Sequence, residues 1–154
     1  MRDSLDIFFM KAAYLYAERS TCTRRKVGSV IVKDGIQISG GYNGSVKQMK
    51  HCTFESCLRK NVISGQDINN CRGAHSETNA IVQAARKGIS VEDATIYCTT
   101  QPCTFCAKAI INSGIKRLVY CEPYGTGLDE LTKEIFENIQ VDIINKEEIF
   151  KKEI

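Results

Sequence analysis

The sequence has no apolar run of about 18 residues, the length that a membrane-spanning helix needs, so we predict no contact with a membrane. Its formal net charge is only +3, whereas a stable complex with nucleic acid calls for a strongly basic surface. The N-terminus carries early acids and no small-residue cleavage site, which argues against a signal peptide. Internal repeats and low-complexity tracts are also missing. We therefore expect a single cytoplasmic globular domain over residues 1–154.

Cysteine, by contrast, is abundant, with eight among 154 residues. Disulfides are disfavoured in a reducing compartment, and a chain of this length does not need them for stability. Metal binding is the better explanation for part of the set.

The strongest motif pairs His75 and Glu77 with Cys103 and Cys106, which belong to a Pro-Cys-x-x-Cys segment that begins 25 residues after Glu77. One imidazole and two thiolates fill three positions of a tetrahedral zinc and leave the fourth for water, whereas a structural site needs a fourth protein ligand. Glu77 is free to act as general acid and base on that water. We predict a catalytic zinc at His75, Cys103 and Cys106, with Glu77 as the catalytic residue. The Cys-x-x-Cys pair alone would also suit a structural zinc knuckle or a redox pair.

The hydrophobic pattern predicts an α/β fold in which both halves of this motif open helices. There the unpaired N–H groups and the positive end of the helix dipole favour thiolates. Strands and helices alternate from residue 94 onward, which predicts parallel strands, and a turn at residues 33–35 predicts an antiparallel hairpin. Residues 40–44 should break regular structure, and residues 45–73 should form a Cys-rich insertion loop. Helices are expected at 5–16, 75–88, 102–114, 128–138 and the C-terminal end, and strands at 27–32, 36–39, 94–98, 116–121 and 141–144.

Together with further segments, the motif resembles the deoxycytidylate (dCMP) deaminases of the cytidine-deaminase-like superfamily. The resemblance implies a three-layer α/β/α sandwich with a mixed five-stranded sheet. It also implies zinc-dependent deamination of dCMP to dUMP and ammonia, which feeds dTMP synthesis. One departure is Ser76, where the family usually has Ala; a hydroxyl should be tolerated because that side chain is not a ligand. The matching segments are residues 19–22, 27–28, 41–44, 51–52, 71–81, 102–108 and 114–116, with Tyr124.

The resemblance further implies substrate and effector contacts. Asn43 would contact the deoxyribose and Tyr124 would lie beside the substrate, although Asn before Gly is also a common turn pair and Tyr124 could simply be a packed aromatic. Gly41, Tyr42 and Gly44 would belong to a nucleotide-binding loop. Family members are commonly homohexamers, and many are activated by dCTP and inhibited by dTTP with Mg²⁺.

Some family members carry a second, structural zinc, which here would order the long loop. A set of free thiols is the alternative. Cys98 and Cys121 lie in predicted strands and are expected in the core. The candidate ligands of the second zinc are Cys22, Cys52, Cys57 and Cys71, with His51 in reserve.

Two other kinds of function stay open. One is a deaminase of another base or nucleoside, such as a tRNA adenosine, guanine or blasticidin; the weak charge argues against tRNA. The other is a non-catalytic, competence-type zinc protein, against which Glu77 argues because a purely structural site has no use for it. The basic group at residues 24–26 is either solvated or in contact with a phosphate of substrate or effector.

Overall fold

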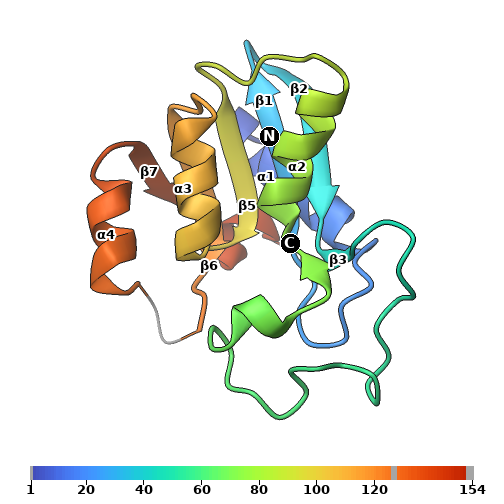
Figure 1. Ribbon diagram of the computed structural model, residues 1–154. Helices are drawn as coiled ribbons and strands as arrows, with labels where there is room; N and C mark the ends of the chain where they lie inside the picture. The colour runs from blue at the N-terminus through green and yellow to red at the C-terminus, as the bar shows by residue number, and fades with distance from the viewer. Residues whose placement is uncertain (1, 126–127, 152–154) are drawn as a thin grey trace.

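A five-stranded sheet forms the centre of the computed structural model, which describes residues 2–125 and 128–151 (Figure 1). The strand order is β2-β1-β5-β6-β7. β1 is antiparallel to β2 and β5, whereas β5, β6 and β7 are parallel, so the mixed sheet is confirmed. The strands are β1 (Gly28–Lys33), β2 (Ile36–Tyr42), β5 (Thr95–Thr100), β6 (Arg117–Glu122) and β7 (Gln140–Ile143).

Helices cover both faces of this sheet, which confirms the three-layer sandwich (Figure 1). On β5, Ile96 and Cys98 pack toward α2 and α3, whereas Tyr97 packs toward α1. Strands buried on both faces read as nearly continuous apolar runs, which is how the central strands could be found in the sequence. One face carries α2 (Ser76–Arg86), α3 (Thr104–Asn112) and α4 (Glu130–Phe136), and the other carries α1 (Leu5–Ala17) and α5 (Lys146–Ile149).

The predicted break at residues 40–44 is wrong, because β2 continues to Tyr42. A Cβ atom on Gly40 would lie 2.5 Å from the ring of Tyr16, and one on Gly41 would lie 2.5 Å from the carbonyl oxygen of Ser76. These glycines therefore allow α1 and α2 to pack closely on the strand, and they do not end it.

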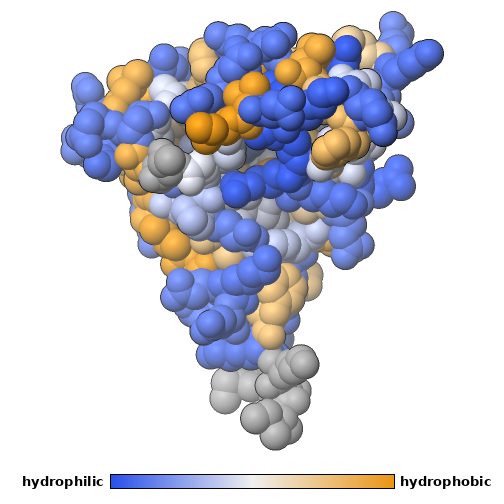
Figure 2. Space-filling model, turned by 90° about the horizontal axis from the view of Figure 1, so that it is seen from below, coloured by the Kyte–Doolittle hydropathy of each residue, from blue (hydrophilic) through white to orange (hydrophobic). Residues whose placement is uncertain are grey.

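The long loop is closed at its base by a feature that the sequence did not reveal. Short strands β3 (Gly44–Ser45) and β4 (Gly73–Ala74) pair in antiparallel fashion. Between them the chain forms turns and one 3₁₀ helix, η1 (Ile68–Asn70). Figure 2 views the molecule from below Figure 1, where this loop lies, and shows a largely hydrophilic surface with apolar residues in separate patches.

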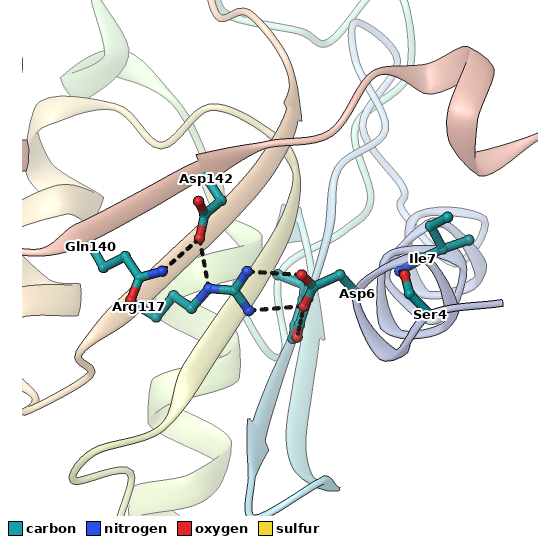
Figure 3. Close-up of polar contacts among 7 residues, drawn as sticks. Ser4, Asp6, Ile7, Arg117, Gln140 and Asp142 are labelled. Carbon is teal, nitrogen blue, oxygen red and sulfur yellow. Dashed lines mark hydrogen bonds and ion pairs between the residues drawn. The ribbon is translucent and has the colours of Figure 1, made fainter.

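A polar cluster ties α1 to β6 and β7 (Figure 3). Arg117 donates from Nη1 and Nη2 to the two oxygens of Asp6, both at 2.8 Å, and from Nε to Asp142 at 2.7 Å. The Tyr97 hydroxyl also donates to Asp6, at 2.7 Å. Hydrogen bonding from Arg117 holds the pKa of the Asp6 carboxyl below its ordinary value, despite partial burial. We call Asp6, Tyr97, Arg117 and Asp142 the arginine clamp.

The expected C-terminal helix is α5, and residues beyond 151 lie outside the described part. Within the described ranges, no helix has both the length and the apolar character needed to cross a membrane.

Candidate active site

The two halves of the zinc motif meet because two neighbouring helices begin at the same end of the sheet. His75 is the N-cap of α2 and Cys103 is the N-cap of α3. Cys106 lies in the first turn of α3, and the Thr78 hydroxyl is 3.6 Å from its sulfur. Both N-cap residues have extended backbone, so their side chains lie in front of the helix ends, where the dipole favours anionic ligands.

These three side chains are arranged as a zinc site requires. Nδ1 of His75 lies 3.4 Å from the sulfur of Cys103 and 3.4 Å from that of Cys106, and the three atoms all lie within 4.8 Å of one another. Zn–S and Zn–N bonds of about 2.3 and 2.0 Å at tetrahedral angles separate sulfur from nitrogen by about 3.6 Å. The residues present therefore fit a zinc ion bound by three protein ligands.

Hydrogen bonding shifts the pKa values of the two thiols in opposite directions. A hydrogen bond from the Cys106 thiol, helped by one from His75, lowers the pKa of Cys103. The pKa of Cys106 is raised by its hydrogen bond to Cys103 and by burial. Cys103 therefore ionises more readily than Cys106, and zinc would have to displace the protons of both thiols.

Glu77 lies beside this group but is buried, with 4% of its surface exposed. Burial raises the pKa of its carboxyl, while the nearby His75 and hydrogen bonds to the carboxylate oppose the rise. Ser76 Oγ donates to Glu77 Oε2 at 3.0 Å and lies 2.6 Å from Ser29 Oγ. The Ser76 hydroxyl is therefore part of the site, whereas the sequence analysis predicted only that a hydroxyl would be tolerated there.

A cavity of about 230 Å³ opens onto His75, Glu77 and Cys103. Asn43, Gly44 and Tyr124 also line it, so most of the predicted substrate contacts border the same space as the zinc motif. The rest of its wall comes mainly from residues 21–25, Val27, the long loop, and Thr100 and Gln101 at the end of β5.

The side chain of Asn43 is largely occupied within the protein. Its Oδ1 accepts from the Val27 amide at 2.8 Å and from Ser20 Oγ at 2.6 Å, and its Nδ2 donates to the Arg25 carbonyl at 2.8 Å. Asn43 thus holds the segment before β1 in place, and one amide hydrogen remains for a ligand.

The predicted nucleotide loop is divided between two environments. Gly44 lines the cavity, whereas Gly41 packs against α2. Tyr42 lies away from the cavity lining, 36% exposed, and its carbonyl accepts from Asn79 at 2.8 Å.

The other cysteines separate into two groups. Cys98 and Cys121 are buried in the core, as predicted. The four candidate ligands of a second zinc line the cavity, but among the described residues no three of them come within 4.8 Å of one another, and His51 is exposed. These four are Cys22, Cys52, Cys57 and Cys71.

Sequence reasoning missed Arg59, which also lines the cavity and is only 7% exposed. It lies in the long loop, where no hydrophobic period marks buried positions, so the sequence offered no signal for it. Of the basic group at residues 24–26, Arg24 and Arg25 line the same cavity.

Comparison with known proteins agrees with this geometry. The model of the cytidine and deoxycytidylate deaminase zinc-binding region matches residues 3–122. ComE operon protein 2 of Bacillus subtilis is 41% identical, over 92% of this chain and 71% of that protein. The deoxycytidylate deaminase of Enterobacteria phage T4 is 40% identical, over 75% of this chain and 76% of the phage protein. That of Saccharomyces cerevisiae is 36% identical, over 93% of this chain but only 45% of the yeast protein.

Among solved structures, the dCMP deaminase of the cyanophage S-TIM5 in apo form matches with a TM-score of 0.73 and 28% identity, over 94% of this chain and all (100%) of that one. The structure of the same phage protein in complex with dCMP and dUMP also gives a TM-score of 0.73, at 24% identity, and supports the fold.

Proposed function

Because the chain belongs to the family that shares the cytidine and deoxycytidylate deaminase zinc-binding region, we propose that it deaminates dCMP hydrolytically to dUMP and ammonia and so feeds dTMP synthesis. The observation that carries the proposal is a buried carboxylate, Glu77, beside the three-ligand group of His75, Cys103 and Cys106. Relatives named deoxycytidylate deaminase, at 36% and 40% identity, support dCMP as the substrate.

Each residue of the site has a defined task in this reaction. His75, Cys103 and Cys106 would hold the zinc, which when bound lowers the pKa of a water to about 7. Glu77 would accept a proton from the water and deliver it to ring N3 of the cytosine as the water oxygen bonds to C4. It would then carry the remaining proton of that oxygen to the amino group, and the C4–N bond breaks to release ammonia. The hydrogen bond from Ser76 keeps the Glu77 carboxylate oriented between these transfers.

The direct test is ammonia release by the zinc-loaded protein from dCMP, cytidine and guanine. We expect dCMP to be consumed with by far the highest kcat/KM. Faster release from another base would favour a different deaminase. No release from any of these substrates would favour the non-catalytic alternative, which the similarity to ComE operon protein 2 keeps worth testing.

We also propose a second, structural zinc bound by ligands from Cys22, Cys52, Cys57 and Cys71, with His51 in reserve. The support is that the four thiols border one cavity, although they must move together to close a site. Metal analysis of the purified protein should find two zinc ions per chain, and a single zinc would count against the second site.

We propose that dCTP activates the protein and that dTTP with Mg²⁺ inhibits it, both through the loop of Gly41, Tyr42 and Gly44. We also propose that the protein assembles into a homohexamer. The exposure of Tyr42 outside the cavity lining supports a ligand contact there. Light scattering would test the assembly, and kinetics with each nucleotide would test the regulation.

We further propose that the chain forms one domain and works in the cytoplasm, where its eight free thiols stay reduced.

A further inference from the structure

Arg59 is a buried guanidinium that no carboxylate neutralises within the described residues. It is 7% exposed, and none of the ion pairs of the described chain includes it. Its Nε and Nη2 both donate to one backbone oxygen, that of Gln66, at 3.1 and 2.6 Å. Burying a charge that no opposite charge compensates costs on the order of several kcal/mol. A fold keeps such a group most easily where a ligand supplies the missing charge.

The guanidinium borders the cavity. Its two bonds to Gln66 use Nε and Nη2, and Arg59 and Tyr124 both line the cavity. Burial raises the pKa of Tyr124, whereas the charge of Arg59 and a hydrogen bond between the two side chains oppose that rise. Arg59 therefore presents its charge to the space that a ligand would enter.

The two neighbouring arginines donate to backbone carbonyls, and Arg24 in this way holds the loop that carries Arg59. Arg24 donates from Nη1 to the carbonyl of Arg59 itself and from Nη2 to that of Val62. Arg25 donates to the Pro123 carbonyl at 3.1 Å and lies 5.8 Å from the centre of the Tyr124 ring. These cations add to the positive potential of the cavity.

The cavity thus carries charges of both signs. Among the described residues that line it, Glu77 is the one carboxylate, and Arg24, Arg25 and Arg59 are the guanidinium groups. A ligand that meets both kinds of charge has an amine-bearing ring for Glu77 and an anion for an arginine, and a guanidinium fork matches the oxygens of a phosphate.

We propose that Arg59 binds the 5′-phosphate of the substrate and makes the site prefer a nucleotide to the corresponding nucleoside. This inference rests on the proposed function, which places the cytosine ring at Glu77. Arg59 is then a specificity-determining residue, separate from the groups that move protons.

The test compares Arg59→Gln with the wild type and with Arg72→Gln. Arg72 is a matched control because it also donates from the long loop to a backbone carbonyl, that of Ser56 at 2.6 Å, but does not line the cavity. We expect Arg59→Gln to lower kcat/KM for dCMP by about 100-fold, mainly through KM, because one member of a buried charge pair is lost. Turnover of deoxycytidine should change by less than about threefold, and Arg72→Gln should leave both substrates unaffected.

Calorimetry gives a second readout that does not need turnover. In the zinc-loaded wild type, dUMP should bind more tightly than deoxyuridine, and Arg59→Gln should abolish most of that difference. If Arg59→Gln does not fold, Arg59→Lys replaces it as the test variant. Because a single ammonium cannot reproduce the guanidinium fork, the preference of Arg59→Lys for dUMP over deoxyuridine should fall several-fold. An unchanged preference in the variant that folds, or an equal loss for nucleotide and nucleoside, would overturn the role of Arg59. A wild type that ignores dCMP but deaminates another base would instead overturn the proposed function.

Discussion

Two arginines, one in the arginine clamp and one in the cavity, differ in how their charge is compensated. Arg117, in the arginine clamp on the α1 side, meets carboxylates of Asp6 and Asp142 at 2.7–2.8 Å (Figure 3). Arg59, in the cavity, is more deeply buried and forms no ion pair among the described residues. A neutralised arginine joins elements of the fold, whereas one left without its counter-charge is ready for a ligand. The comparison predicts that changes to the clamp affect stability and that changes to the cavity affect turnover.

Metal removal should have the largest effect, and this effect should be on turnover in the cavity and not on the arginine clamp. Treatment with a zinc chelator should lower kcat for dCMP by at least about 10³-fold, because the activated water is lost. Added zinc should restore the activity. Ammonia release and metal content, measured on the same samples, check this; full activity after the metal has been removed would contradict the assignment of His75, Cys103 and Cys106.

Breaking the arginine clamp should lower the stability of the protein and leave its KM for dCMP unchanged. Arg117→Met should lower the free energy of unfolding by about 1–2 kcal/mol, since hydrogen bonds to partly exposed carboxylates are lost. The KM for dCMP should stay the same. Urea unfolding and steady-state kinetics test both parts. Lys133→Met, which removes an exposed pair with Glu130, is the control and should cost less than about 0.5 kcal/mol. A clamp variant with normal stability but altered KM would contradict the claim that the clamp serves stability and the cavity serves turnover.

The Ser76 hydroxyl should have a smaller, purely kinetic effect. Ser76→Ala removes one hydrogen bond to the Glu77 carboxylate, which is worth about 1 kcal/mol, so kcat for dCMP should fall by about fivefold. Ser39→Ala is a matched control, because its hydroxyl donates to the Ala80 carbonyl on the same helix without reaching Glu77. If both variants kept the wild-type kcat, Ser76 would have no positioning role.

The smallest effect expected is a dependence of clamp stability on pH. The pKa of Asp6 is lower in the folded protein than its ordinary value of 3.8, chiefly through Arg117. Its stabilising contribution is therefore complete above that value and is lost as pH falls below 3.8 through the lower folded pKa. The stability difference between wild type and Asp6→Asn should accordingly shrink as unfolding is measured at progressively lower pH. A difference that grew on acidification would contradict the ion pair.

Local patterns allowed much of this molecule to be predicted from its sequence. The order of helices and strands followed from apolar periodicity, and the starts of α2 and α3 coincided with a motif whose spacing already specified zinc ligands. The continuation of β2 through Gly41 was not predictable, because it depends on the close approach of Ser76 from a helix far along the chain. Arg59 was missed for the same reason. Its burial depends on Gln66, Arg24 and the fold of the whole loop, and no neighbouring residue signals it.

The most direct test of the central claim is turnover of dCMP by Glu77→Gln. Gln is nearly the same size as Glu and cannot take a proton from water, so ammonia release should fall by at least about 10³-fold. Because Glu77 is not a ligand, zinc content and the unfolding midpoint should match those of the wild type. Substantial turnover with the amide in place would contradict the role of Glu77, and loss of zinc from the variant would contradict its place outside the ligand set.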